Sequence, residues 1–376
     1  MIIRTITCHH AFNQGAMLQA YALVTYLQSL GHDAKVIDYR PPYMPPVKVD
    51  YKLVWPQFNY PIIKQLYLLY SLPAKFFEQK RRDCLESYFV DNICVTQKQY
   101  HSIDELRDDP PSADLYIAGS DQIWNSAKKI KNGKDPAFYL DFGKPKRKIS
   151  YAASFATNEL VAGTAEFVSR QLRNFDAISV REHSAKEILS SLGFDGQVVV
   201  DPVMLLDRKQ WDLVVNENED FTNDRYILVY DFEPRGSVIK PVARKLASML
   251  KCKIYSVNPS APFFDYADKS YSLSDPKRFV SLIKHAQCVI SNSLHGTLFS
   301  MIYGKDFFVI NRKDGLNIRM QDLLERYQLT ERIIGVDAQS DILRKSVDYE
   351  KVNALLCQDI ESSKSFLQHQ IDLAKE

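Results

Sequence analysis

The segment Cys288-Val289-Ile290-Ser291-Asn292-Ser293-Leu294-His295-Gly296-Thr297-Leu298-Phe299-Ser300 joins an apolar, strand-like run to an apolar, helix-like run through a short polar turn. The first N–H groups of a helix have no partner within the helix, and the helix dipole makes that end positive. The turn and the start of the helix therefore predict an anion site at the carboxyl edge of a sheet. The candidate ligand contacts are Ser291, Ser293, Leu294, Gly296 and Thr297.

His295 is the candidate catalytic residue of this segment. An imidazole with an ordinary pKa of about 6.5 exchanges protons readily near neutral pH. A helix N-terminus favours its neutral form, whereas a bound dianion favours the imidazolium form. The alternative interpretation is a capping or core histidine, because a single histidine more often has one of those roles.

Strand and helix patterns alternate on both sides of this segment. In the first part of the chain, strands are predicted over 2–8, 34–39, 114–118, 148–154, 177–180 and 198–200. After the polar stretch 203–224 the pattern restarts, with strands over 226–230, 254–257, 288–291 and 307–310. Helix-like runs between the strands favour parallel sheets covered by helices on both faces. We expect an α/β fold of two Rossmann-like domains that face each other across a cleft.

The domain boundaries follow from the same pattern. We expect an N-terminal α/β domain over 1–205, in which the aromatic-rich residues 47–110 form a helical insertion with a helix over 74–92. Ordinary core helices are the alternative for that stretch. A C-terminal α/β domain with the anion site is expected over 206–345, and 346–376 is expected to be a helical tail that packs back on the N-terminal domain.

The composition narrows the class of protein. The 376 residues are 45% apolar and carry a net charge of +2, so a packed core is expected and a dedicated nucleic-acid binder is not. No apolar run approaches the ~20 residues that span a bilayer, so we expect no transmembrane segment. The six cysteines contain no C-x-x-C pair, so a zinc or redox motif is not expected. Several lie in apolar runs, which is typical of small core residues in a reducing compartment. We expect a cytoplasmic protein.

Three more groups of polar residues follow predicted strands. Arg181 comes directly after 177–180, where its guanidinium can clamp a carboxylate or phosphate or pair on the surface with Glu182. Gly119-Ser120-Asp121-Gln122-Ile123-Trp124-Asn125 follows 114–118. Its Asp121, Gln122 and Asn125 offer polar groups to a sugar, and Trp124 offers a ring to stack on it. A helix cap is the alternative role for Asp121.

Asn13 and Gly15 lie in the turn between the first strand and the first helix, which is the usual ligand-facing turn of a doubly wound domain or, alternatively, a simple helix cap. No complete G-x-G-x-x-G or P-loop is present, so a dinucleotide or ATP site is not indicated. Arg319 opens a later helix, facing either the cleft or the surface. No His/Asp/Glu cluster has the spacing of metal ligands, and we expect neither a metal nor a redox cofactor.

Taken in order, these pieces resemble the polysaccharide pyruvyl transferase family. The matching pieces are residues 13–23, 119–125, 151–155, 179–182, 200–202 and 293–300, which read NQGAMLQAYAL, GSDQIWN, YAASF, SVRE, VDP and SLHGTLFS. They cover residues 1–330, and the first and last pieces together are fairly specific.

The resemblance implies a GT-B-like fold with the active site between two domains, and phosphoenolpyruvate as the donor. The product would be a pyruvate ketal on a sugar of a capsule or other exopolysaccharide, or of its lipid-linked oligosaccharide precursor. His295 and Arg181 match residues that contact the donor in relatives. We expect His295 to protonate the methylene carbon or to bind phosphate only, and Asp121 or Gln122 to orient the attacking hydroxyl.

The chain departs from some relatives at Ser293, where those relatives carry an arginine directly before Leu-His. One positive charge at the donor site is then unaccounted for. Arg319, Lys305 and Arg312 are the candidates to supply it.

Two other functions are alternatives: a GT-B glycosyltransferase with a nucleotide-sugar donor, and a non-catalytic sugar-binding relative. Binding of a nucleotide without phosphoenolpyruvate would favour the first, and ligand binding without turnover would favour the second. The aromatic segment 51–70 is a candidate for transient contact with the inner face of a membrane, and packing within the protein is its alternative.

Overall fold

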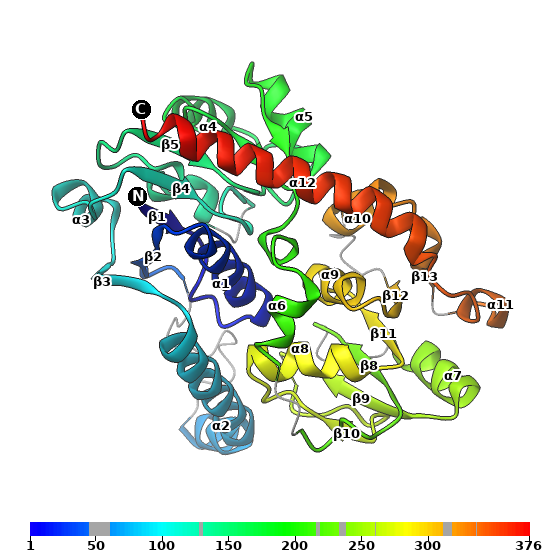
Figure 1. The fold of residues 1–376 in the computed structure, drawn as a ribbon. Helices are drawn as coiled ribbons and strands as arrows, with labels where there is room; N and C mark the ends of the chain where they lie inside the picture. Colours follow the sequence, from blue (N-terminus) through cyan, green and yellow to red (C-terminus); the bar gives the residue numbers. More distant parts are fainter. Residues whose placement is uncertain are drawn as a thin grey trace.

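The computed structural model describes residues 1–44, 61–127, 131–215, 219–232, 238–259, 261–310, 318–335 and 337–376. It contains two large parallel sheets, one in each half of the chain, and helices surround both (Figure 1). The α/β class predicted from the alternating pattern is confirmed. Residues 45–60, which include the first half of the aromatic segment proposed to contact a membrane, lie outside the described residues, as does Arg312.

The sheet of the N-terminal half has the strand order β3-β2-β1-β4-β5. The central strand β1 pairs in parallel with β2 and β4, which places Ile3 beside Ala34 and Leu115. Strand β4 is buried along its whole length, as expected for a strand covered on both faces. The five strands are β1 (Ile2–Ile6), β2 (Asp33–Tyr39), β3 (Val95–Tyr100), β4 (Leu115–Ala118) and β5 (Arg147–Ser150).

Helices and a short strand pair complete this half. Bridges at Ile149 and Ala153 connect the pair β6 and β7 to the region of β5. The elements are α1 (Gln14–Ser29), α2 (Pro61–Asn92), α3 (Ile103–Asp108), α4 (Ala165–Leu172), β6 (Ser179–Val180), α5 (His183–Ser191) and β7 (Gln197–Val198).

The sheet of the C-terminal half has the order β10-β9-β8-β11-β12-β13. Its parallel strands are β8 (Tyr226–Tyr230), β9 (Lys253–Val257), β10 (Lys269–Ser270), β11 (Cys288–Ser291), β12 (Asp306–Ile310) and β13 (Ile333–Ile334). The helices of this half and of the connection are α6 (Arg208–Asp212), α7 (Lys240–Leu250), α8 (Pro276–His285), α9 (Leu294–Ile302), α10 (Ile318–Arg326), α11 (Ser340–Leu343) and α12 (Tyr349–Leu373).

Three boundaries differ from the sequence prediction. The expected insertion over 47–110 contains β3, which pairs with β2, so this part of the chain is an edge of the sheet. Helix α2 begins at Pro61 and continues through Pro73, where the prediction began at residue 74. After the strand at 288–291, the sequence pattern predicts a helix over 297–303. That helix begins at Leu294, so His295 is its second residue.

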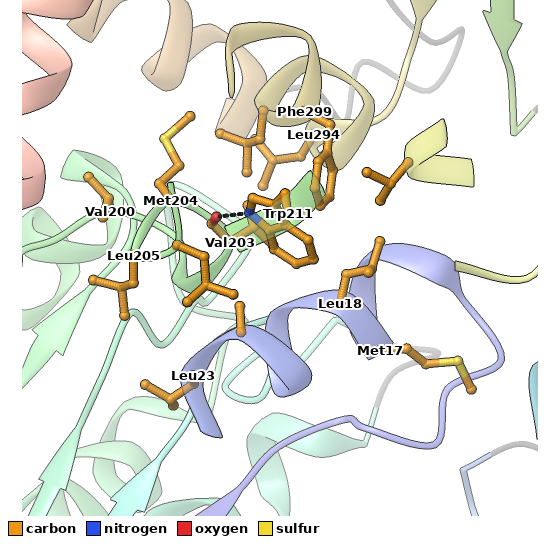
Figure 2. Close-up of a cluster of buried hydrophobic side chains, with 14 of the residues drawn as sticks. Met17, Leu18, Leu23, Val200, Val203, Met204, Leu205, Trp211, Leu294 and Phe299 are labelled. Atoms are coloured by element: carbon orange, nitrogen blue, oxygen red, sulfur yellow. Dashed lines mark hydrogen bonds between the residues drawn. The ribbon is translucent and has the colours of Figure 1, made fainter. Parts of the chain in front are cut away.

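An apolar cluster joins the two halves of the protein. Trp211 of α6 lies against Phe299 of α9, with ring centroids 4.8 Å apart, and its indole N–H donates to the carbonyl oxygen of Val203 at 2.9 Å. Figure 2 shows Leu18 of α1 on the other side of the same tryptophan. Helices α1 and α9 therefore pack on one shared core.

Helix α12 runs across both halves (Figure 1, red). Near its start, the Tyr349 hydroxyl donates to the carbonyl oxygen of Ser300 at 3.1 Å. Near its end, Arg147 of β5 donates to the Gln370 side chain at 2.8 Å, and Leu367 is fully buried. The helix thus contacts the N-terminal sheet after leaving the C-terminal one.

Candidate active site

The carboxyl ends of the central strands in the two sheets border one cavity of about 250 Å³. The loops after β1 and β4 contribute Asn13, Asp121 and Gln122, and the loop after β11 with α9 contributes Ser293 and His295. Each sheet reverses its strand order at this position, between β1 and β4 or between β8 and β11. Ligand sites of open α/β sheets form at such switch points.

His295 lies at the N-terminal end of α9 and packs against α1. A Cβ atom at Gly15 would lie 2.1 Å from His295 Nδ1, so only glycine allows this approach. His295 Nε2 lies 3.7 Å from Asp201 Oδ2 and has no hydrogen-bond partner among the described residues. Burial lowers the pKa of His295, and Arg181 acts in the same direction, while Asp201 opposes them. The free protein therefore holds this imidazole largely neutral near pH 7.

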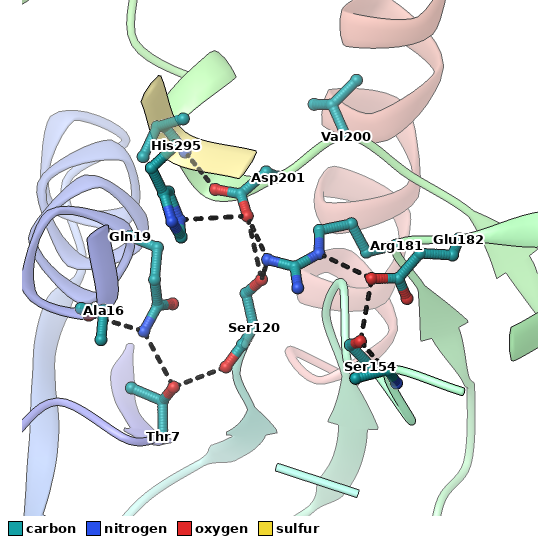
Figure 3. Close-up of polar contacts among 12 residues, drawn as sticks. Thr7, Ala16, Gln19, Ser120, Ser154, Arg181, Glu182, Val200, Asp201 and His295 are labelled. Atoms are coloured by element: carbon teal, nitrogen blue, oxygen red, sulfur yellow. Dashed lines mark hydrogen bonds and ion pairs between the residues drawn. The ribbon is translucent and has the colours of Figure 1, made fainter. Parts of the chain in front are cut away.

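Asp201 lies between His295 and Arg181 (Figure 3). Its Oδ2 atom is 2.6 Å from an Arg181 guanidinium nitrogen, and its Oδ1 atom accepts the Val203 N–H at 3.1 Å. Burial alone would raise the pKa of Asp201, but His295 and Arg181 outweigh burial and lower it. Asp201 is thus a buried, ionised carboxylate that a charged His295 can face.

Arg181 has a second carboxylate partner. Its Nε atom donates to Glu182 at 3.1 Å, and Glu182 also accepts from the Ser154 hydroxyl at 2.8 Å. The other terminal nitrogen of Arg181 is buried without a hydrogen-bond partner in the described part of the chain. The guanidinium is therefore fixed on two sides and keeps donor capacity for one more acceptor.

A polar chain behind the site supports Asp201 from α1. Gln19 donates to the Thr7 hydroxyl at 3.0 Å, and Thr7 donates to the carbonyl oxygen of Ser120 at 2.6 Å. The Ser120 hydroxyl in turn lies 3.5 Å from Asp201 Oδ2. All four residues are buried, so the loop after β4 is held firmly beside the ion pair.

Asp121 and Gln122 line the cavity from the N-terminal half of the protein. Asp121 has a φ of 77°, a left-handed conformation that is uncommon for a residue other than glycine and that clusters at functional sites. Its carbonyl oxygen accepts the N–H groups of Ile123 and Ser154 at 2.8 and 3.1 Å, which hold this turn. The Gln122 amide, with its oxygen turned toward α10, accepts from Arg319 at 2.8 Å. This contact connects the two halves across the cavity.

The structure corrects the sugar-stacking role predicted for Trp124. The ring is fully buried, stacks parallel to Tyr139 at a centroid distance of 5.5 Å, and donates to the carbonyl oxygen of Phe138 at 3.1 Å. Asn125 is buried too, and its side-chain nitrogen lies 2.7 Å from the Gln122 amide, so it packs behind that residue. Among the described residues, Phe232, at the carboxyl end of β8, is an aromatic side chain that does line the cavity.

Asn13 and Ser293, the N-cap residues of α1 and α9, differ in one respect. Asn13 Oδ1 accepts the N–H groups of Gly15 and Ala16, so this cap is filled by the chain itself. Ser293 makes no such side-chain bond to its helix. The N-terminal end of α9 therefore faces the cavity without a capping side chain, and its dipole favours an anion there.

Three of the predicted anion contacts do not border the cavity. The Ser291 hydroxyl donates to the carbonyl oxygen of Tyr230 at 2.9 Å, and the Thr297 hydroxyl donates to that of Ser293 at 3.3 Å. Gly296 packs so closely that a Cβ atom would lie 2.6 Å from Ser291 Oγ. These residues shape the turn, because the two hydroxyl groups are bonded to backbone carbonyls and Gly296 packs against Ser291.

Arg319 borders the cavity, in contrast to Lys305. Lys305 comes directly before β12, at the amino end of the sheet and thus at the edge opposite to the site. The sequence did not single out Asp201 or Phe232 as site residues. The signal for both was available, since each follows an apolar strand-like run at its carboxyl end.

In the described ranges, no helix has the length and apolar character needed to cross a membrane. The same ranges hold no group of three or more His, Cys, Asp or Glu side chains arranged for a metal ion.

Comparison with known proteins adds a family and a fold. The model of a family described as polysaccharide pyruvyl transferase matches residues 13–314. A search of curated proteins finds no match. Among solved structures, UDP-N-acetylglucosamine 2-epimerase from Rickettsia bellii is 11% identical with a TM-score of 0.50, covering 100% of this chain and 96% of that one. The UDP co-structure of S. aureus MnaA is 11% identical with a TM-score of 0.49, covering 100% and 98%.

The glycosyltransferase SnogD from Streptomyces nogalater is 12% identical with a TM-score of 0.39, covering 96% of this chain and 94% of that one. At 11% identity, the likeness to the Rickettsia bellii structure concerns the fold alone. The predicted GT-B-like arrangement of two parallel sheets is confirmed.

Proposed function

Because the chain belongs to the polysaccharide pyruvyl transferase family, we propose that it transfers the pyruvyl group of phosphoenolpyruvate to a sugar of a cell-surface polysaccharide or its precursor. The donor would occupy the cavity between the two sheets. The product would be a cyclic pyruvate ketal, and phosphate would be released.

The observation that carries this proposal is the position of His295. It lies at the uncapped N-terminus of α9, beside the buried Asp201–Arg181 pair, and it borders a cavity to which both halves contribute. An anion is favoured at this end of the helix. We place the phosphate there and the carboxylate toward the remaining donor of Arg181, with Arg319 supplying the charge that Ser293 lacks.

The reaction needs one proton for the methylene carbon and one proton for the leaving phosphate. Phosphate binding beside His295 favours its imidazolium form, and the ionised Asp201 stabilises that form further. His295 then donates its proton to the methylene carbon, which becomes a methyl group, and cationic character develops at C2. The first sugar hydroxyl adds to C2, phosphate departs, and the neighbouring hydroxyl closes the ketal. One hydroxyl proton restores His295, and the other leaves with phosphate.

The acceptor would enter on the side of Asp121 and Gln122. The carboxylate of Asp121 is suited to orient or deprotonate the attacking hydroxyl. Phe232 replaces Trp124 in our account as the apolar surface against which a sugar ring packs.

The test is a transfer assay with phosphoenolpyruvate and a panel of saccharides, with and without lipid carriers. We expect phosphate release that depends on acceptor, and a product whose mass rises by one pyruvate minus one water. Release of phosphate without a modified saccharide would show that the protein hydrolyses phosphoenolpyruvate and does not transfer its pyruvyl group. Activity with a nucleotide sugar in place of phosphoenolpyruvate would instead identify a glycosyltransferase.

A further inference from the structure

Asp322 connects the two halves of the protein directly beside the site. It lies on α10 of the C-terminal half, and its Oδ2 atom accepts the backbone N–H of His183 at 2.8 Å. His183 is the first residue of α5 in the N-terminal half. Burial raises the pKa of Asp322, and the His183 N–H opposes that rise, as expected for a partly buried carboxylate with one good donor.

The connection lies close in sequence to two arginines on opposite walls. Arg181 precedes His183 by two residues, and Arg319 precedes Asp322 by three, which places Arg319 and Asp322 on one face of α10. Arg181, Arg319 and Asp322 also line one small cavity of about 20 Å³. The hydrogen bond between Asp322 and His183 therefore fixes how far apart the two guanidinium groups can lie.

The other end of α10 is bonded to α12, at a point where α12 also contacts the N-terminal half, since the Val200 N–H donates to Ser363 at 2.9 Å. Arg326 Nε lies 2.6 Å from an Asp359 carboxylate oxygen on α12. Removing the Asp322 side chain would leave this attachment in place and release α10 from α5 only. The effect would thus fall on the position of the α10 turn that carries Arg319 relative to α5, and less on the fold of either half.

We infer that Asp322 is a positioning residue that sets the spacing of Arg181 and Arg319 and so selects donors with two anionic groups, a phosphate and a carboxylate, held apart by a short linker. This rests on the proposed function for the identity of the donor. Asp322 would act without touching the substrate. The spacing of the two arginines would be the physical reason why ligands with one anionic group bind less well.

Binding measurements on the full chain test the selection. We would compare phosphoenolpyruvate with inorganic phosphate for wild type, Asp322→Ala, Asp322→Asn and Gln321→Ala, where Gln321 is an exposed control on the same helix. We expect Asp322→Ala to weaken phosphoenolpyruvate binding about tenfold or more, the usual scale for losing a hydrogen bond to a charged group. Phosphate binding should change less than about threefold. Asp322→Asn should fall between, since its amide oxygen still accepts, and Gln321→Ala should match wild type.

Equal loss of both ligands, or no loss of either, would overturn the inference. Hydrogen exchange of the ligand-free protein gives a second, independent arm. The His183 amide should exchange faster in Asp322→Ala than in wild type or Gln321→Ala, and unchanged exchange would contradict the connection itself. If wild type fails to bind phosphoenolpyruvate while the exchange result holds, the proposed donor is wrong and the connection between the halves stands.

Discussion

At the scale of residues, His295 has a pKa that should show in the stability of the protein. Its pKa is lowered in the folded state, so the unfolded chain takes up this proton at higher pH than the native protein. Stability should therefore fall as the pH drops through the unfolded value of about 6.5 toward the lower native one. In His295→Gln this part of the slope should vanish, as urea unfolding at several pH values would reveal. Parallel slopes for the two proteins would contradict the account.

The same residue has a kinetic prediction. His295→Gln should reduce kcat by about 10² to 10⁴, the range for removal of a positioned general acid. The exposed His369 on α12 is a matched control, and His369→Gln should retain full kcat. Turnover near the wild-type value in His295→Gln would exclude His295 from proton transfer.

The position of a site residue could be predicted from the sequence where that residue directly follows a predicted strand. The positions of His295, Asp121 and Gln122 follow from their place after strands, because parallel strands end at the same edge of a sheet. The burial of Trp124 did not follow, since its partners Tyr139 and Phe138 come from a 3-10 turn with no signal in the strand pattern. Asp201 also follows a predicted strand, but its role did not follow from that position. The role depends on Arg181 and His295, which come together with it only in the folded protein.

At the scale of elements, the contact between α1 and α9 should be the most sensitive to an added side-chain atom. Gly15→Ala would place a methyl group 2.1 Å from His295 Nδ1, so the His295 ring or one of the two helices must shift. We expect a loss of about 1–3 kcal/mol in the free energy of unfolding, together with loss of activity. Ser29→Ala, at the exposed end of α1, is the control. Unchanged unfolding and activity in Gly15→Ala would mean that the two helices do not meet as described.

The elements themselves were largely predictable, and their ends were not. Apolar runs of four to seven residues marked the strands, and the helix starts were set by hydrogen bonds that the run itself does not encode. Helix α9 begins three residues before its predicted start, because Ser293 takes an extended conformation and its carbonyl oxygen accepts from Thr297. Strand β3 was assigned to an insertion because its sequence VTQKQY is mostly polar, as an edge strand allows.

At the scale of the whole molecule, α12 should couple the stability of the two halves. Leu367→Ala removes a fully buried side chain where α12 packs on the N-terminal half, and we expect a loss of about 2–5 kcal/mol. Gln368→Ala, exposed on the same helix, should cost almost nothing. Urea unfolding measures both. Equal midpoints for the two variants would show that α12 does not hold the halves together.

The central claim is that the cavity between the halves binds phosphoenolpyruvate, and thermal unfolding with added ligands tests it most directly. Wild type and Arg319→Ala would be compared with phosphoenolpyruvate, pyruvate, phosphate, UDP and CMP. At 100 times its Kd, phosphoenolpyruvate should add about 2.7 kcal/mol to wild-type stability, and the variant should lose most of that gain. Stabilisation by UDP or CMP, with none by phosphoenolpyruvate, would contradict the account and assign the cavity to a nucleotide-sugar donor.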